Sequence, residues 1–320
     1  MHKEDRAMSR RASGIALAFV TAAISGVAVF LNGYAVKEFG NATLYTTAKN
    51  LVAAILLVAI LAVASRAKLP GAIHSSWGFT RPRGAREIAG LVAVGIIGGG
   101  IPFVLFFEGL ARTSSTSAAF IQKMLVIFVA VLAVTFLKER FTILHAAAIG
   151  VLVLGQAIVA GGLGHPALDA GEAMVFAATI LWSIEIAIAK PLLGRLSALT
   201  VGAGRMAIGL VVLAGFSVSS GAIAQLSHVT PTGWLWAVAT GIILTAYVAT
   251  WYAALARAQA TDVTAVLVSA AIVTAVLNAG VKGASLAPTA FGLSLIVAGA
   301  MAIAVLAVRP HQTAAGMRAA

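Results

Sequence analysis

The sequence predicts an all-α membrane protein with ten transmembrane helices in two inverted repeats of five, and three observations support this fold class. Ten apolar stretches are long enough to cross a bilayer, the second five resemble the first five, and basic residues gather between the stretches. Only 10% of the 320 residues are charged, whereas soluble domains carry about 25% charged residues. A surface this apolar is unsuited to water, so we expect the lipid bilayer to be the solvent.

Each predicted helix has about 20 residues, which at a rise of 1.5 Å per residue crosses a hydrocarbon core of about 30 Å. The first repeat, 12–161, contains helices at 12–33, 43–65, 87–110, 114–137 and 141–161. The second repeat, 170–308, contains helices at 170–190, 197–220, 231–254, 260–281 and 288–308. Residues 1–11 and 309–320 are predicted to be tails. The basic connection 66–86 is expected to lie at the membrane interface, with partner binding as an alternative.

The distribution of Lys and Arg predicts the orientation, because cytoplasmic connections carry an excess of these residues. With the N-terminus in the cytoplasm, sixteen of them lie inside and three, Lys37, Arg112 and Lys282, lie outside. The remaining three are within predicted helices. We therefore expect both termini to face the cytoplasm of a bacterial inner membrane.

Short sequence matches indicate the internal repeat. Gly95-Ile96-Ile97 recurs as Gly241-Ile242-Ile243, and Leu110-Ala111-Arg112 recurs as Leu255-Ala256-Arg257. Lys49 and Arg205 also occupy matching places near the start of the second helix of each half. Because each half has five helices, an odd number, the halves are expected to insert with opposite orientations.

The turn before the fifth helix carries Phe136-Leu137-Lys138-Glu139-Arg140, and glycines follow at 150 and 155. This arrangement resembles the EamA family of the drug/metabolite transporter superfamily, which has a Gly-Glu-Arg-like turn and a glycine-rich fifth helix. The resemblance implies ten helices and transport of small organic metabolites, often amino acids. The second half departs from the pattern, because Val281-Lys282-Gly283-Ala284 contains no acid.

Five ionisable residues lie within the predicted helices, where such groups usually face a cavity or pair with each other. Their depths along the helices place Lys49 near Glu108 in the outer half and Arg205 near Glu185 in the inner half. These depths predict two ion pairs, which either are structural or act as gates that break and reform. Lys123 is left without a partner near the midplane, where transporter substrates bind. We expect it to bind an anionic group of the substrate, or to have a partner that the sequence does not reveal.

Other polar and aromatic residues complete the predicted cavity. The amides within apolar stretches either join helices or bind substrate: Asn32, Asn50, Gln122, Gln156 and Asn278. The aromatic candidates either lie at the membrane interface or line the cavity: Trp182, Tyr247, Trp251 and Tyr252. Gly99, Gly100 and Pro102 interrupt the third helix and are predicted to form a hinge.

Composition excludes several other functions. Without cysteine, the chain has no disulfide, thiolate metal site or cysteine nucleophile. The net charge of +12 would suggest a nucleic-acid partner in a soluble protein, but here the bases fit lipid headgroups. None of the six histidines has a metal-ligand partner four residues away. We therefore expect no enzyme activity, no nucleic acid, no metal and no cofactor.

The predicted function is secondary transport, with the two repeats closing in turn around a midplane cavity. The most favoured substrates for export are amino acids, including aromatic or other apolar ones. A single chain contains both repeats, so the pathway needs no second copy. A multidrug or organic-cation exporter is the alternative, and a channel or a non-transport membrane subunit is less favoured. Three bases against two acids within the helices favour a substrate with a carboxylate.

Overall fold

The computed structural model describes residues 3–67, 77–161 and 169–309, and within these ranges all regular structure is helical. Nine stretches of the described chain are long and apolar enough to cross a membrane, and α8 is a shorter tenth helix of 17 residues. This supports a multi-pass membrane protein.

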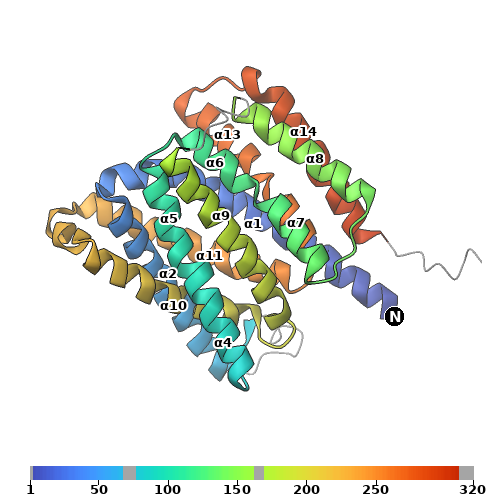
Figure 1. Cartoon of the computed structure of the whole chain (residues 1–320), viewed down its shortest axis with the longest axis horizontal. Coiled ribbons are helices and arrows are strands. Elements are labelled where there is room, and N and C mark those ends of the chain that lie inside the picture. The colour runs from blue at the N-terminus through green and yellow to red at the C-terminus, as the bar shows by residue number, and fades with distance from the viewer. Residues whose placement is uncertain (1–2, 68–76, 162–168, 310–320) are drawn as a thin grey trace, which may run out of the picture.

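The first half contains α1 (Lys3–Phe39), α2 (Ala42–Arg66), α4 (Ala85–Val94), the π-helical η1 (Gly95–Gly100), α5 (Ile101–Leu110), α6 (Ser115–Lys123), α7 (Leu125–Thr135) and α8 (Ile143–Val159). The second half contains α9 (Ala170–Leu192), α10 (Ala198–Ser219), the 3₁₀ segment η2 (Ala222–His228), α11 (Pro231–Leu255), α12 (Ala260–Leu267), α13 (Ala270–Lys282), the 3₁₀ segment η3 (Ala287–Thr289) and α14 (Ala290–Val308). Figure 1 shows α8 and α14 side by side along one edge of the molecule.

Side-chain caps start many of these helices, because the first N–H groups of a helix have no partner within it. Five helices, α2, α6, α9, α10 and α11, begin with an oxygen-bearing side chain that accepts a hydrogen bond from the first turn. In that order the capping residues are Asn41, Ser114, Asp169, Ser197 and Thr230.

The structure differs from the predicted elements in four places. Residues 3–11, predicted to be part of a tail, form the start of α1. The predicted helix 87–110 contains the π-helical segment η1, and the predicted helices 114–137 and 260–281 are each broken in two. Residues 68–76 of the long connection and 310–320 of the C-terminal tail lie outside the described ranges.

The packing of the helices relates the two halves. The first helix of each half packs against the third helix of the other, so α1 contacts α11 while α9 contacts α4 and α5. A Cβ atom on Gly95 would lie 2.4 Å from Ile208 Cβ, and one on Gly241 would lie 2.6 Å from Val52 Cβ. Val52 and Ile208 are separated in sequence by the same interval as Lys49 and Arg205. These matched contacts support a structural repeat.

Candidate functional site

A central cavity of about 190 Å³ lies between helices of both halves. It contains nine of the residues singled out from the sequence. These are Asn32, Lys49, Gln122, Lys123, Trp182, Glu185, Arg205, Tyr247 and Trp251. Side chains from distant parts of the chain therefore converge on one space.

Two helix breaks reach this cavity from opposite halves. The first break is at Met124, between α6 and α7, and the second is at Val268 and Ser269, between α12 and α13. Lys123, directly before the first break, and Val268, in the second, both line the cavity. Interrupted helices that expose polar backbone near a central site are a known feature of secondary transporters.

Lys123 is the last residue of α6, directly before the first break. Its side chain lines the central cavity and also a second cavity, and Gln122 lines both as well. Among the described residues, no acidic side chain forms an ion pair with Lys123. The position therefore presents an uncompensated amine to the cavity, as the sequence indicated.

The Gly98 carbonyl of the π-helical segment η1 accepts hydrogen bonds from side chains of the site. In a regular helix the Gly98 carbonyl would accept from the N–H of residue 102, but Pro102 has no N–H. The Gly98 carbonyl instead accepts hydrogen bonds from Trp182 Nε1 at 3.0 Å and from Arg205 Nη2 at 2.9 Å. The predicted hinge is thus joined to α9 and α10 through one backbone oxygen.

Glu185 and Arg205 both lie beside Gly98, but the predicted ion pair between them is not found among the described residues. A Cβ atom on Gly98 would lie 2.3 Å from Glu185 Cγ and 3.2 Å from Arg205 Nε. Glu185 Oε1 accepts a hydrogen bond of 2.6 Å from the Tyr252 hydroxyl. Tyr252 was predicted to line the cavity, but it is fully buried behind Glu185. Its hydroxyl orients the carboxylate from outside the cavity.

The predicted pair Lys49–Glu108 is not formed in the structure. Lys49 Nζ lies 4.4 Å from the centroid of the Phe107 ring, a cation–π contact. Glu108 Oε2 instead lies 3.0 Å from Arg112 Nη2, and Glu108 Oε1 accepts a 2.7 Å hydrogen bond from Thr43. Arg112 is one helical turn after Glu108, which makes it a better-placed partner than a base on another helix.

Aromatic rings form two sides of the central cavity. Phe103 and Phe106 of α5 lie within 5.6 Å and 5.5 Å of the Trp182 ring, centroid to centroid. On another side, Tyr247 and Trp251 stack with an interplanar angle of 8°. These walls suit an apolar or aromatic group beside the polar end of a ligand.

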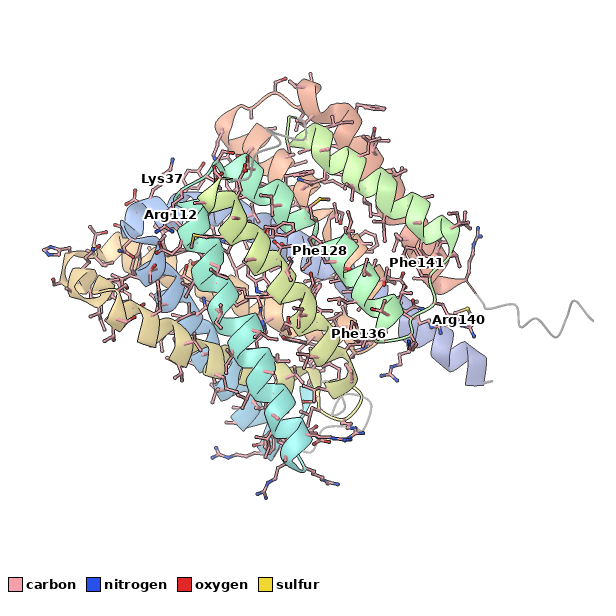
Figure 2. The ribbon with its side chains drawn as sticks, viewed as in Figure 1. Lys37, Arg112, Phe128, Phe136, Arg140 and Phe141 are labelled. Atoms are coloured by element: carbon pink, nitrogen blue, oxygen red, sulfur yellow. The ribbon has the colours of Figure 1, made fainter. Side chains whose placement is uncertain are left out.

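The cavity opens toward one end of the molecule. A second cavity of about 560 Å³ shares Asn32, Phe107, Gln122 and Lys123 with the first. It extends to Lys37 at the end of α1 and is also lined by Gln156 and Asn278. Figure 2 shows Lys37 and Arg112 at this end. Asn278 Nδ2 donates to the Thr274 carbonyl at 2.9 Å, so this predicted ligand lies in the entrance and not in the central cavity.

The opposite end is closed by contacts to the end of α11, the start of α12 and the connection between them. The Glu139 carboxylate accepts from the N–H groups of Ala260 at 2.7 Å and Thr261 at 3.1 Å. Lys190 donates to the Leu255 and Ala258 carbonyls, and Arg10 donates to Ala256. We call these contacts of Glu139, Lys190 and Arg10 the Glu139 clamp. Between the clamp and the cavity, side chains such as Val263 and Leu199 are fully buried.

Several site features were missed from the sequence. The role of the Gly98 carbonyl was not anticipated, nor was the aromatic face of α5. The spacing of Phe103, Phe106 and Phe107, at positions i, i+3 and i+4, is the signal that indicates one helix face. Glu139 was noticed only as part of a family motif, and nothing in its spacing indicates that it binds α12.

Sequence comparison assigns this arrangement to a class of proteins. A model of the EamA-like transporter family matches residues 12–161 and again 169–305. The two matches cover most of the chain, so the protein belongs to the EamA-like transporter family of the drug/metabolite transporter superfamily. It is a multi-pass membrane transporter, and the family consists of transporters and not of enzymes.

Two individual relatives refine the comparison. One is described as a probable terminal-alkyne amino-acid exporter from Streptantibioticus cattleyicolor and is 30% identical over 136 residues. That alignment covers 42% of this chain and spans about half of the relative, 46% of its length. A solved crystal structure matches 93% of this chain and 99% of its own, with a TM-score of 0.71 and 17% identity. At that identity the structural likeness establishes the fold alone.

Proposed function

We propose that this transporter exports small metabolites that carry a carboxylate, and that amino acids are its principal substrates. The observation that carries the proposal is Lys123, whose amine faces the central cavity without an acidic partner among the described residues. A substrate carboxylate would compensate this charge within a low-dielectric site. Gln122 and Asn32 line the same space and supply further hydrogen-bonding groups.

The aromatic walls support an amino acid with an apolar or aromatic side chain. Phe103, Phe106 and Trp182 form one wall, and Tyr247 and Trp251 form the other. The relative named as a probable amino-acid exporter is consistent with this substrate class.

The transport mechanism that we propose is alternating access across a bacterial inner membrane. The end that carries the Glu139 clamp would face the cytoplasm, as the basic connections suggest, and the open end would face outward. Release of the clamp, with closure of the α5 and α6 end, would then expose Lys123 to the cytoplasm. The binding residues come from one chain, so a monomer would suffice for transport.

The test is transport in proteoliposomes with a panel of radiolabelled amino acids, using wild type and Lys123→Ala. Because a charge-assisted hydrogen bond contributes about 1.5–3 kcal/mol, we expect the variant to raise the half-saturating concentration roughly tenfold or more. Lys37→Ala is the matched control, since Lys37 is exposed at the mouth of the same open space. The control is expected to transport normally.

Two outcomes would contradict parts of the proposal. Unchanged transport by Lys123→Ala would retain an amino-acid transporter and discard Lys123 as the carboxylate ligand. Failure to move any amino acid, with efflux of organic cations instead, would favour the multidrug alternative. In that case Glu185, an acid in the aromatic-walled cavity, would be the next residue to substitute.

A further inference from the structure

A separate cavity of about 650 Å³ lies at the closed end, beside the Glu139 clamp. Its walls come from α1, the turn between α7 and α8, the end of α9 and the connection between α11 and α12. Five bases and one acid line it. The bases are Arg11, Lys138, Arg140, Lys190 and Arg257, and the acid is Glu139.

The single acid, Glu139, offsets one of the five positive charges. Both oxygens of Glu139 accept hydrogen bonds from the start of α12, including those from Ala260 N at 2.7 Å and from the Thr261 hydroxyl at 3.1 Å. Lys190 donates to backbone carbonyls, which carry no net charge. The cavity therefore retains an excess of positive charge that an anion would compensate.

Exposed apolar side chains lie on the wall of the same cavity and on the helix that follows it. Phe136 lines the cavity and is 73% exposed, and Ile143, at the start of α8, is 82% exposed. Figure 2 shows Phe136, Arg140 and Phe141 close to the turn between α7 and α8. A ligand seated here would have its charge among the bases and an apolar portion against Phe136.

We propose that this basic cavity binds the phosphate headgroup of an anionic phospholipid, with the acyl chains along the exposed face beside Phe136. The charge excess selects an anion, and the apolar rim selects a lipid over a free phosphate. The site lies on the elements of the Glu139 clamp, so a bound lipid joins α1, α9 and the turn at Lys138. The proposal does not depend on which substrate is transported.

The experiment measures phosphatidylglycerol binding to the purified full-length protein by native mass spectrometry, with phosphatidylcholine as the neutral comparison. The test variant is Lys138→Gln with Arg140→Gln, two exposed bases of the cavity. Each base near a membrane surface changes affinity roughly fivefold, so we expect roughly 25-fold weaker binding for the pair. The matched control, Arg81→Gln with Arg83→Gln, removes two exposed bases outside the cavity and should bind normally.

Three results would overturn the proposal. Equal binding by wild type and the test variant would show that the cavity is not the lipid site. Equal weakening by the control variant would show that binding depends only on the general surface charge. Inorganic phosphate that displaces phosphatidylglycerol and stabilises the protein equally well against heat would assign the cavity to a free anion. Selective loss in the test variant, with no competition by phosphate, is the expected result.

Discussion

At the scale of single residues, the site depends on close contacts that only glycine permits. Gly99 of η1 and Gly209 of α10 face each other, and a Cβ atom on Gly99 would lie 2.2 Å from the Arg205 carbonyl oxygen. The close approach of the two backbones lets Arg205 reach the Gly98 carbonyl at 2.9 Å. The glycines thus determine where the buried guanidinium lies.

Gly99→Ala is expected to destabilise the protein by about 1–3 kcal/mol, because the new methyl group overlaps a backbone oxygen that cannot rotate away. Thermal unfolding in detergent measures this. Gly150→Ala is the control, since a Cβ atom there meets nothing within 4 Å. That change should be neutral or stabilising by up to about 1 kcal/mol, because alanine favours helix. Equal stability of the two variants would show that the contact with α10 relaxes freely.

Residue-level prediction from the sequence succeeded in part, and the reason is geometric. Depth along a helix follows from the rise per residue, which placed Lys123 near the midplane and Glu185 and Arg205 in the inner half. In the structure these three residues line one cavity. Depth does not give the direction in which a side chain points. Neither the pairing of Lys49 with Glu108 nor that of Arg205 with Glu185 is therefore found among the ion pairs of the described residues. The roles of these residues in binding or gating stay predictions.

At the scale of elements, the Glu139 clamp holds the first turn of α12 from a turn far away in the sequence. A carboxylate at a helix N-terminus satisfies N–H groups that have no partner in the helix and interacts favourably with the helix dipole. The corresponding stretch of the second half, Val281–Ala284, contains no acid to repeat these bonds. The clamp therefore breaks the symmetry of the two halves.

Glu139→Gln is expected to loosen the closed end, because the amide is uncharged and can turn a donor toward the N–H groups of α12. The loss of charge-assisted bonds contributes about 1.5–3 kcal/mol. The measurement is alkylation of Val263→Cys, a buried position behind the clamp, by a hydrophilic maleimide. We expect Val263→Cys to be labelled roughly tenfold faster, or more, in the Glu139→Gln background than in the presence of Glu139.

The control for that experiment is Glu172→Gln, the same chemical change in the first turn of α9, away from the clamp. Labelling of Val263→Cys should be unaffected by it. If Glu139→Gln left the labelling rate unchanged as well, the clamp would not determine access from this end.

The helix breaks show the limit of prediction at this scale. Both fall in ordinary apolar sequence, at Met124 and at Val268-Ser269, without glycine or proline. No local preference stops a helix there, so packing against the other half sets the break. The distortion in the third helix was easier to predict, because Gly98 to Gly100 and Pro102 are themselves poor helix formers.

At the scale of the whole molecule, the orientation that we propose can be tested directly because the chain has no cysteine. Single cysteines at exposed Ser9 and Ser227 lie toward opposite ends of the molecule in this arrangement. A membrane-impermeant maleimide added to intact cells should label Ser227→Cys at once. Ser9→Cys should react only after the membrane is permeabilised. The reverse pattern would invert the topology and place the open end of the cavity in the cytoplasm.

The closed state of one end affects how transport would depend on the cytoplasmic concentration of substrate. In the proposed orientation, cytoplasmic substrate binds only the fraction of molecules whose Glu139 clamp has opened, so its apparent affinity is the intrinsic affinity multiplied by that fraction. Each additional 1.4 kcal/mol or so of clamp stability lowers the fraction tenfold. Under the proposed function, the clamp would thereby set the half-saturating concentration, so that a scarce metabolite would be retained and an accumulating one would be released as overflow.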